Sequence, residues 1–173
     1  MGLVIDVRPA RRDELDAITA IEGEADQVFV PLFGPLDWQP RPGIERIGTP
    51  GFLLVAGDPA AGFAHVMELE GWAHLEQLAV RPSMFRRGIG TALVRAAMAE
   101  ASRRGYGEIS LCTYADVPWN APFYRLLGFE EVERPGPLHR RMREHEQDIG
   151  LDQHGRRVVM TARISTETGS GSI

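Results

Sequence analysis

Residues 82–93 read PSMFRRGIGTAL and hold two adjacent arginines, followed by two glycines one residue apart. A strand-like stretch, HLEQLAV, precedes them and a helical pattern follows, so the glycines fall at the first turn of a helix. The backbone N–H groups of that turn have no partner inside the helix. Gly88 and Gly90 let the backbone approach an anion closely, and Arg86 and Arg87 add cationic donors. This combination suits a pyrophosphate.

Two other phosphate-binding motifs do not match this segment. A P-loop needs Gly-Lys-Ser/Thr after its first glycine, and the chain has no such run. A dinucleotide fingerprint needs a third Gly or Ala where Leu93 stands, and its glycines follow the strand directly, whereas RPSMFRR intervenes here. The remaining alternative is that the glycines only permit a tight turn between strand and helix.

A second segment, NAPFYRLLGF at 120–129, supports the anion-binding interpretation. Together with LAVRPSMFRRGIGTALV it resembles the two motifs of the GNAT superfamily of N-acetyltransferases, an acetyl-CoA-binding loop and a downstream Asn-x-x-x-Tyr-x-x-x-Gly-Phe signature. The resemblance covers the element order over about 5–134 and is sharp over 74–129. It implies a cytoplasmic, acetyl-CoA-dependent enzyme that acetylates a primary amine of a small molecule or peptide by direct transfer in a ternary complex.

The resemblance also implies which residues bind acetyl-CoA. The backbone of Leu78 and Val80 would hold the pantetheine arm, and Asn120 is either a cofactor contact or a helix cap. The pyrophosphate would be held by consecutive backbone amides, those of Arg86, Arg87, Gly88, Ile89, Gly90 and Thr91. Phe85 departs from the family pattern, which has Gln or Arg there. If the amides carry the pyrophosphate, this change weakens binding only modestly.

Acetyl transfer to an amine needs a base and is helped by an acid. An alkylamine with a pKa of about 10 is only about 0.1% neutral at pH 7, so a base must take its proton. The resembled family places the tyrosine that protonates the CoA sulfur at the position of Tyr124, four residues before Gly128. Tyr124 is therefore expected to be the general acid. The alternative is a core aromatic on a short helix, a role that Phe123 already fills.

For the base, the stretch AHLEQLAV offers His74 and Glu76, whose side chains share one face of a strand because side chains alternate. Glu76 ranks slightly ahead, since a carboxylate also attracts a cationic amine. The alternative for each is a solvated or hydrogen-bonded strand residue. Cys112 lies within a strand with no His or Asp beside it, which indicates a buried, inert thiol.

The acceptor would bind under the region between the first and second strands, residues 22–48. Phe29, Phe33 and Trp38 lie there among acidic residues, which suits an amine with an apolar or aromatic body. Packing of these aromatics in the core is an equally good explanation. The histidines near the carboxyl end show no metal-ligand spacing, so no metal is expected, and HRRMREHEQD is interpreted as a solvated helix face.

The elements that must position these residues follow from periodicity and turn signals. Strands are predicted at 3–9, 51–57, 61–71, 72–80, 107–114, 129–134 and 156–163. Helices are predicted at 11–29, 42–48, 88–104, 117–128 and 137–150. This order predicts an α/β fold, with a mixed, mostly antiparallel central sheet of about seven strands flanked by helices. The final strand, as a terminal edge strand, could pair with a second subunit in a homodimer.

Composition restricts the remaining possibilities. The 173 residues fit one domain, expected at 1–164 with a disordered tail at 165–173. The net charge of −5 makes nucleic acid an unlikely partner, no stretch is apolar enough to span a membrane, and a single cysteine suits a reducing cytosol. A non-catalytic acyl-CoA-binding regulatory module is the alternative function. Phe85 slightly favours that module, whereas Tyr124 favours the enzyme.

Overall fold

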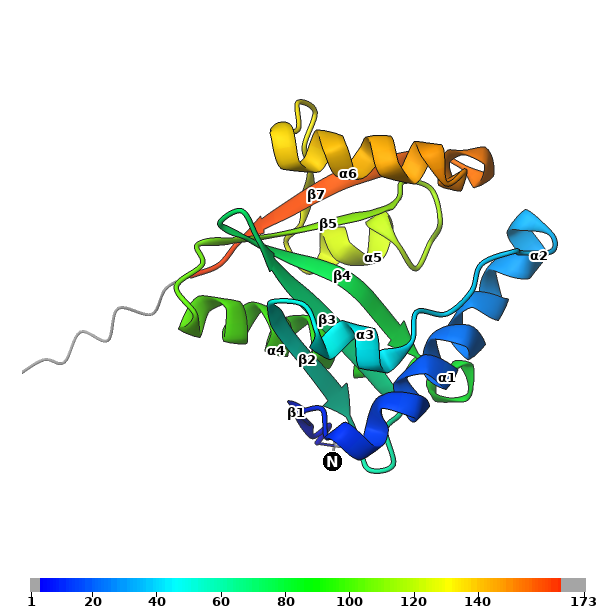
Figure 1. Cartoon of the computed structure of the whole chain (residues 1–173), viewed down its shortest axis with the longest axis vertical. Coiled ribbons are helices and arrows are strands. Elements are labelled where there is room, and N and C mark those ends of the chain that lie inside the picture. Colours follow the sequence, from blue (N-terminus) through cyan, green and yellow to red (C-terminus); the bar gives the residue numbers. More distant parts are fainter. Residues whose placement is uncertain (1–3, 166–173) are drawn as a thin grey trace, which may run out of the picture.

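The computed structural model describes residues 4–165, and residues 1–3 and most of the predicted tail, 166–173, lie outside the described part. One sheet of seven strands organises the chain, in the order β1-β2-β3-β4-β5-β7-β6 (Figure 1). The strands are β1 (Val7–Pro9), β2 (Gly51–Ala56), β3 (Gly62–Leu69), β4 (Trp72–Val80), β5 (Glu108–Tyr114), β6 (Glu130–Glu131) and β7 (Arg157–Arg163). The mixed sheet that the sequence predicts is confirmed.

The helices lie on both faces of this sheet. They are α1 (Leu15–Asp26), α2 (Val30–Phe33), α3 (Gly43–Ile47), α4 (Ile89–Arg103), α5 (Ala121–Leu126) and α6 (Pro137–Asp148). Single 3-10 turns precede α1, α2 and α4 and follow α6. α4 ends as predicted, since Gly105 adopts a left-handed conformation just beyond it and donates its N–H to the Ser102 carbonyl at 2.9 Å.

Four predicted elements differ in extent by several residues. The predicted helix at 117–128 is reduced to Ala121–Leu126. The helical path does not stop at residue 29 but continues through α2, because Pro31 lies in the first turn of α2, where a missing N–H costs nothing. The predicted strand at 3–9 is reduced to Val7–Pro9, and the one at 129–134 to Glu130–Glu131. Each pairs over two or three positions only, which limits its length.

β7 is not a free edge strand, which corrects the sequence-based reason for a homodimer. It lies between β5, with which it pairs over its whole length, and β6, which pairs with Met160 and Thr161. The Val132 N–H adds a bond to the Val159 carbonyl at 2.9 Å. A strand covered on both sides cannot offer its backbone to a second subunit along those positions.

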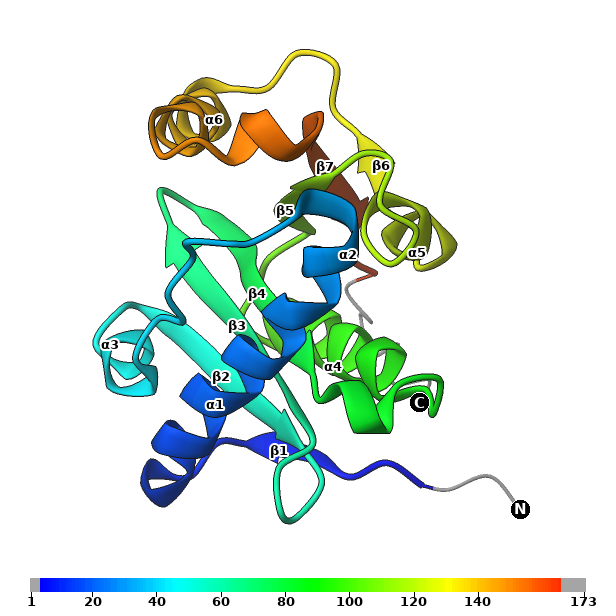
Figure 2. The ribbon, with the colours of Figure 1, turned by 90° about the vertical axis from the view of Figure 1, so that its right-hand side faces the viewer.

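The sheet has an apolar layer on each face. α4 packs on one face through the predicted stripe of Ile89, Leu93, Ala97 and Ala101, which are all buried. α1 packs on the other face, where Ile18 and its neighbours cover the opposite side chains of β2, β3 and β4. Figure 2 shows α1 and α4 on opposite sides of these strands. The alternation of side chains along each strand supplies both layers.

Only β4 and β5 run parallel among neighbouring strands, and they pair over three positions. Ala73, His74 and Leu75 face Ile109, Ser110 and Leu111, and beyond these pairs the two strands separate. The β5-facing edge of β4 from residue 76 to 80 therefore has no strand partner in the described part of the chain. This separation opens the sheet at the middle of the molecule.

Leu93 gives a direct test of the α4 face. It is fully buried and packs in the core formed by α4 and the sheet, so Leu93→Ala should lower the free energy of unfolding by about 2–5 kcal/mol. Leu126→Ala is the matched control, since Leu126 is 87% exposed and its loss should change stability by less than about 0.5 kcal/mol. Urea denaturation measures both, and equal effects would contradict the packing described here.

Candidate active site

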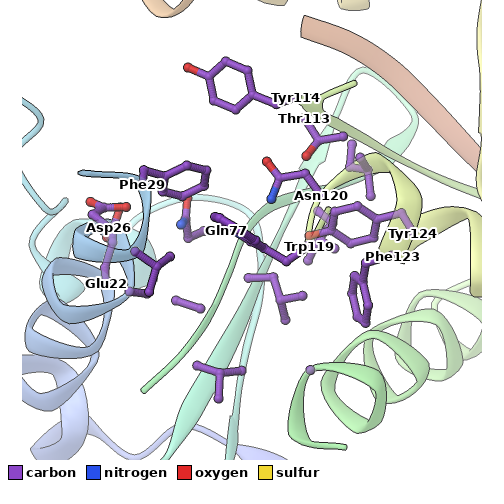
Figure 3. A pocket seen from close by; sticks show the side chains of 18 of the residues that line it. Glu22, Asp26, Phe29, Gln77, Thr113, Tyr114, Trp119, Asn120, Phe123 and Tyr124 are labelled. Atoms are coloured by element: carbon purple, nitrogen blue, oxygen red, sulfur yellow. The ribbon is translucent and has the colours of Figure 1, made fainter. Parts of the chain in front are cut away.

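A cavity of about 1140 Å³ lies where β4 and β5 separate, and residues of both strands form one wall of it. Its other walls come from the loop before α4, the first turn of α4, the start of α5 and the end of α1. Figure 3 shows Tyr124 and Asn120 on one side, Glu22 and Asp26 on the other, and Gln77 between them. The sequence motifs at 82–93 and 120–129 thus meet at a single cavity.

The loop before α4 presents backbone donors to this cavity. Arg86 and Gly88 both have positive φ, of 61° and 79°, so the chain turns sharply before the helix begins at Ile89. Within the described residues, the N–H groups from Arg86 to Thr91 donate to no acceptor. Consecutive free N–H groups at the N-terminus of a helix of this length form an anion-binding site, reinforced by the helix dipole.

Most of the residues predicted to bind acetyl-CoA line the cavity. Leu78, Val80, Arg86, Asn120 and the start of α4 from Gly88 to Thr91 do so, whereas the side chain of Arg87 does not. Asn120 is the N-cap residue of α5, but its side chain forms no cap hydrogen bond there, so its amide is available to the cavity. Phe85 also lines the cavity and is 43% exposed.

Tyr124 lies at the cavity wall on α5. Its ring packs against Phe123 and Phe129, with centroids 5.1 and 5.6 Å away, and only 8% of the residue is exposed. Burial raises the pKa of its hydroxyl, which therefore holds its proton at neutral pH. No group in the described residues forms a hydrogen bond with that hydroxyl. The phenol is thus protonated and unpaired beside the cavity.

Glu76 occupies a bulge in β4. Leu75 faces Val66 and Gln77 faces His65 on β3, so Glu76 is an extra residue between two regular pairs. A bulge of this kind redirects a side chain at the point where pairing changes. Glu76 lines the cavity, but its carboxylate also contacts Arg46 and His65, which do not line it.

Those groups form a buried charge cluster around Arg46, a residue of α3. The Arg46 guanidinium is fully buried and binds both Glu22 of α1 and Glu76 of β4, and His65 Nδ1 lies 3.0 Å from the Glu76 carboxylate. Burial opposes ionisation of Glu76, but the His65 hydrogen bond and the charge of Arg46 outweigh it and lower the pKa to about 2. Glu76 is therefore a permanently ionised partner of Arg46.

Burial is the main cause of the pKa shifts of two carboxylates on α1, Glu22 and Asp26. It raises the pKa of Glu22 despite the opposing charge of Arg46. Burial, together with the charge of Glu22, raises the pKa of Asp26 to about 6. Glu22 and Asp26 are four residues apart and project from the same helical face into the cavity (Figure 3).

His74 lies outside the cavity. Its Nδ1 is 2.9 Å from Ser110 Oγ, and the same hydroxyl lies 2.8 Å from His139 Nε2 on α6. Burial, followed by the neighbouring His139, lowers the pKa of His74 to about 4. His74 and Glu76 share a face, yet their surroundings differ. The interpretation of α6 as wholly solvated is wrong at His139, which is 3% exposed.

Aromatic residues cover one end of the cavity. The Phe29 ring lies within 5.5 Å of both Trp38 and Trp119, measured between centroids, and 6.1 Å from Tyr114. All four line the cavity, whereas Phe33 lies behind them and stacks on His154. Two of the three aromatics predicted to contact the acceptor therefore reach the cavity directly.

Cys112 also lines the cavity, and it is half-buried. Burial raises the pKa of its thiol to about 12, which keeps it protonated and unreactive. Within residues 4–165, no cluster of three or more His, Cys, Asp and Glu side chains is arranged to hold a metal ion. None of the helices in the same range has the length and apolar character that a membrane crossing requires.

Comparison with known proteins agrees with this geometry. The family model described as Acetyltransferase (GNAT) family matches residues 21–129, which is more than half of the chain. The chain belongs to the GNAT acetyltransferase family. It is an acetyl-CoA-dependent N-acetyltransferase, and acetyl-CoA is its co-substrate. The free N–H groups before α4 and the cavity beside them fit a bound CoA pyrophosphate and its arm.

Solved structures share this fold at low sequence identity. The ribosomal-protein-S18-alanine N-acetyltransferase from Escherichia coli is 20% identical, with a TM-score of 0.68 over 98% of this chain and 100% of that one. The paia N-acetyltransferase from Thermoplasma acidophilum, in complex with coenzyme A, is 16% identical, with a TM-score of 0.70 over 93% and 99%. The N-acetylglutamate synthase from Neisseria gonorrhoeae is 17% identical, with a TM-score of 0.69 over 95% and 36%.

Sequence reasoning missed Arg46 and His65 in this GNAT protein, and it placed Asp26 only among the acidic residues around the predicted acceptor aromatics. Arg46 comes from a segment interrupted by Pro and Gly, and nothing local indicates that it reaches β4. His65 faces Gln77 only because β3 and β4 pair in this register. Asp26 had a readable signal, since its i, i+4 spacing from Glu22 places two carboxylates on one helical face.

Removal of the Arg46 cation should expose how much the buried cluster depends on it. Arg46→Met leaves Glu22 and Glu76 buried without their partner and should cost about 3–5 kcal/mol at pH 7. Without Arg46 the folded protein favours protonated carboxylates. The loss relative to wild type should therefore shrink as pH falls below the usual Glu pKa of about 4.5.

The control for this variant is Arg103→Met, which removes an exposed guanidinium paired with Glu100 on α4. Exposed pairs contribute about 0–1 kcal/mol, so this variant should remain near wild type. Urea denaturation at pH 4 and pH 7 compares the two. A pH-independent loss in Arg46→Met would contradict the described electrostatics.

Proposed function

We propose that this GNAT protein moves the acetyl group of acetyl-CoA directly to a primary amine of a small molecule or peptide while both substrates are bound. The observation that supports it is the single cavity, which has anion-binding amides at one end and carboxylates with aromatics at the other. Tyr124 lines the same cavity, on the side opposite Glu22 and Asp26 (Figure 3). Two substrates that meet in one cavity need no covalent enzyme intermediate, and the protonated Cys112 thiol offers none.

The chain's own residues would hold acetyl-CoA along the open edge of β4. The N–H groups from Arg86 to Thr91 would bind the pyrophosphate, with Arg86 and Arg87 as nearby cations. The unpaired backbone of Leu78 and Val80 would bind the pantetheine arm as an added strand would. Phe85 cannot donate a hydrogen bond to a phosphate, so the amides carry that task.

The thioester supplies an acyl group that is already activated toward attack by nitrogen. Tyr124 would give its proton to the sulfur as the carbon–sulfur bond breaks and the carbon–nitrogen bond forms. The surplus proton on the new amide nitrogen then restores the phenol, so Tyr124 is unchanged after each turnover. A buried phenol that keeps its proton suits this role.

The acceptor end of the cavity indicates an amine with an apolar or aromatic body. Phe29, Trp38, Tyr114 and Trp119 provide flat apolar surfaces, and aromatic faces also attract cations. Glu22 and Asp26 lie beside them and favour a positively charged head group. We therefore propose arylalkylamines, or peptides with an aromatic first residue, as the acceptor class.

A second candidate is a non-catalytic acyl-CoA-binding module, for which Phe85 in the phosphate loop is the supporting observation. The two candidates differ in one measurement. The enzyme releases free thiol from acetyl-CoA when amines such as 2-phenylethylamine or tryptamine are added. The module binds acetyl-CoA in calorimetry but releases no thiol with any amine.

Tyr124→Phe removes the proposed acid and keeps the ring. We expect kcat to fall about 10²–10⁴-fold, while the Kd for acetyl-CoA measured by calorimetry stays the same. Tyr106→Phe is the matched control, because its hydroxyl binds Glu68 at 3.1 Å and does not line the cavity. An unchanged kcat in Tyr124→Phe would remove Tyr124 from the mechanism.

Gly88→Ala tests the phosphate loop. Its φ of 79° costs an alanine about 1–2 kcal/mol, so the binding conformation becomes rarer and the Kd for acetyl-CoA should rise about tenfold. Gly105→Ala is the matched control, since it has a φ of 93° at the opposite end of α4. It should lose similar stability with no change in Kd. Equal Kd values for the two variants would argue against pyrophosphate binding at this loop.

A further inference from the structure

Four carboxylates line the active-site cavity, and they differ in what they already bind. These are Glu22, Asp26, Asp37 and Glu76. Arg46 binds the first and the last, and in addition Glu22 accepts the Arg41 backbone N–H at 3.2 Å. Glu76, which the sequence favours as the base, and Glu22 are thus already paired with a cation.

Asp26 and Asp37 remain. Within residues 4–165, neither forms a hydrogen bond or an ion pair with another residue. Asp37 is exposed, whereas Asp26 is half-buried at the carboxyl end of α1, three residues before Phe29 of the aromatic group. Figure 3 shows Asp26 beside Glu22 and Phe29 at the acceptor end of the cavity. A half-buried carboxylate without a partner favours a cation that arrives from outside.

We propose that Asp26, rather than Glu76 or His74, binds the ammonium group of the acceptor and takes its proton. This inference rests on the proposed function. The Glu76 carboxylate serves instead as a positioning group, which holds Arg46 and the β4 bulge in place. His74 is excluded from this role because it lies outside the cavity and is paired with Ser110.

The proton step balances without a further reactant. A nitrogen–hydrogen bond of the ammonium breaks, the proton forms a bond to an Asp26 carboxylate oxygen, and the nitrogen keeps the electron pair. The neutral amine can then attack the acetyl carbonyl carbon. Asp26 returns its proton to solvent through the cavity opening, which accounts for the one proton released per acetylation.

The groups that face Asp26 favour this exchange. Glu22, one turn earlier on α1, raises the proton affinity of Asp26, and the Arg46 cation of α3 lowers it to a smaller extent. Burial is the largest cause, and it raises the pKa of Asp26 to about 6 together with Glu22. The other charged residues on the cavity wall are Asp37, Glu76, Arg86 and Arg157, and none of them contributes to this shift. A base with a pKa near the working pH can both accept and release a proton rapidly.

The test is the pH profile of kcat/KM for thiol release with acetyl-CoA and 2-phenylethylamine or tryptamine. Wild type should reach a plateau above about pH 6, where Asp26 is ionised. The kcat/KM of Asp26→Asn should be lower than that of wild type by about 10²–10⁴-fold at pH 7. Its rate should instead keep rising about tenfold per pH unit toward the pKa of the amine itself, about 10.

Two control variants separate this role from a general effect of charge. Asp37→Asn removes an equal charge from the same cavity and should keep the wild-type plateau. Glu76→Gln should lower the melting temperature, because Arg46 loses a partner, and should also keep the plateau. Asp26→Asn should fold well and melt at a higher temperature above pH 6, since it relieves a buried charge next to Glu22.

Three outcomes would overturn the proposal. A wild-type pH plateau of kcat/KM in Asp26→Asn would remove Asp26 from the proton step. If the plateau were lost in Glu76→Gln alone, the step would belong to Glu76. An equal change in Asp37→Asn would show that only net charge matters. If wild type binds acetyl-CoA but releases no thiol with either amine, the proposed function fails, and the role of Asp26 fails with it.

Discussion

The separation of β4 from β5 is the constraint on which the rest of the molecule depends. The two strands pair at only three positions, from Ala73 to Leu75, and then leave a backbone edge unpaired. Unpaired backbone groups need hydrogen-bond partners when they are buried, and a bound pantetheine chain can provide them. The same separation leaves room for the cavity, so one break in the sheet produces both the unpaired strand edge and the space beside it.

The two ends of that cavity are built differently. The amides at the start of α4 are fixed by backbone conformation, because Arg86 and Gly88 turn the chain and the N–H groups from Arg86 to Thr91 have no acceptor among the described residues. The opposite end depends on side chains from α1, from the 3-10 turn that follows it and from the loops around Trp38 and Trp119, which the sheet does not fix. An anion site built from backbone tolerates changes in the side-chain wall beside it.

Charge pairing decides which carboxylates are free to react. Arg46 neutralises Glu22 and Glu76 and so stabilises the junction of α1, α3 and β4. Glu76, which the buried guanidinium holds ionised, is a good structural partner but a weak base, because its affinity for a proton is low. Asp26 has the opposite surroundings, with burial and a like charge, and its proton affinity is raised.

The sequence by itself determined the strand and helix order, the α4 stripe, the glycine loop and the position of Tyr124, because each depends on local periodicity or on a short motif. Only the tertiary structure decided that β7 lies inside the sheet, that His74 pairs with Ser110, and that Arg46 forms an ion pair with Glu76. These outcomes join residues about 30 or more positions apart. They depend on strand register and on how helices pack across the sheet, which no local pattern encodes.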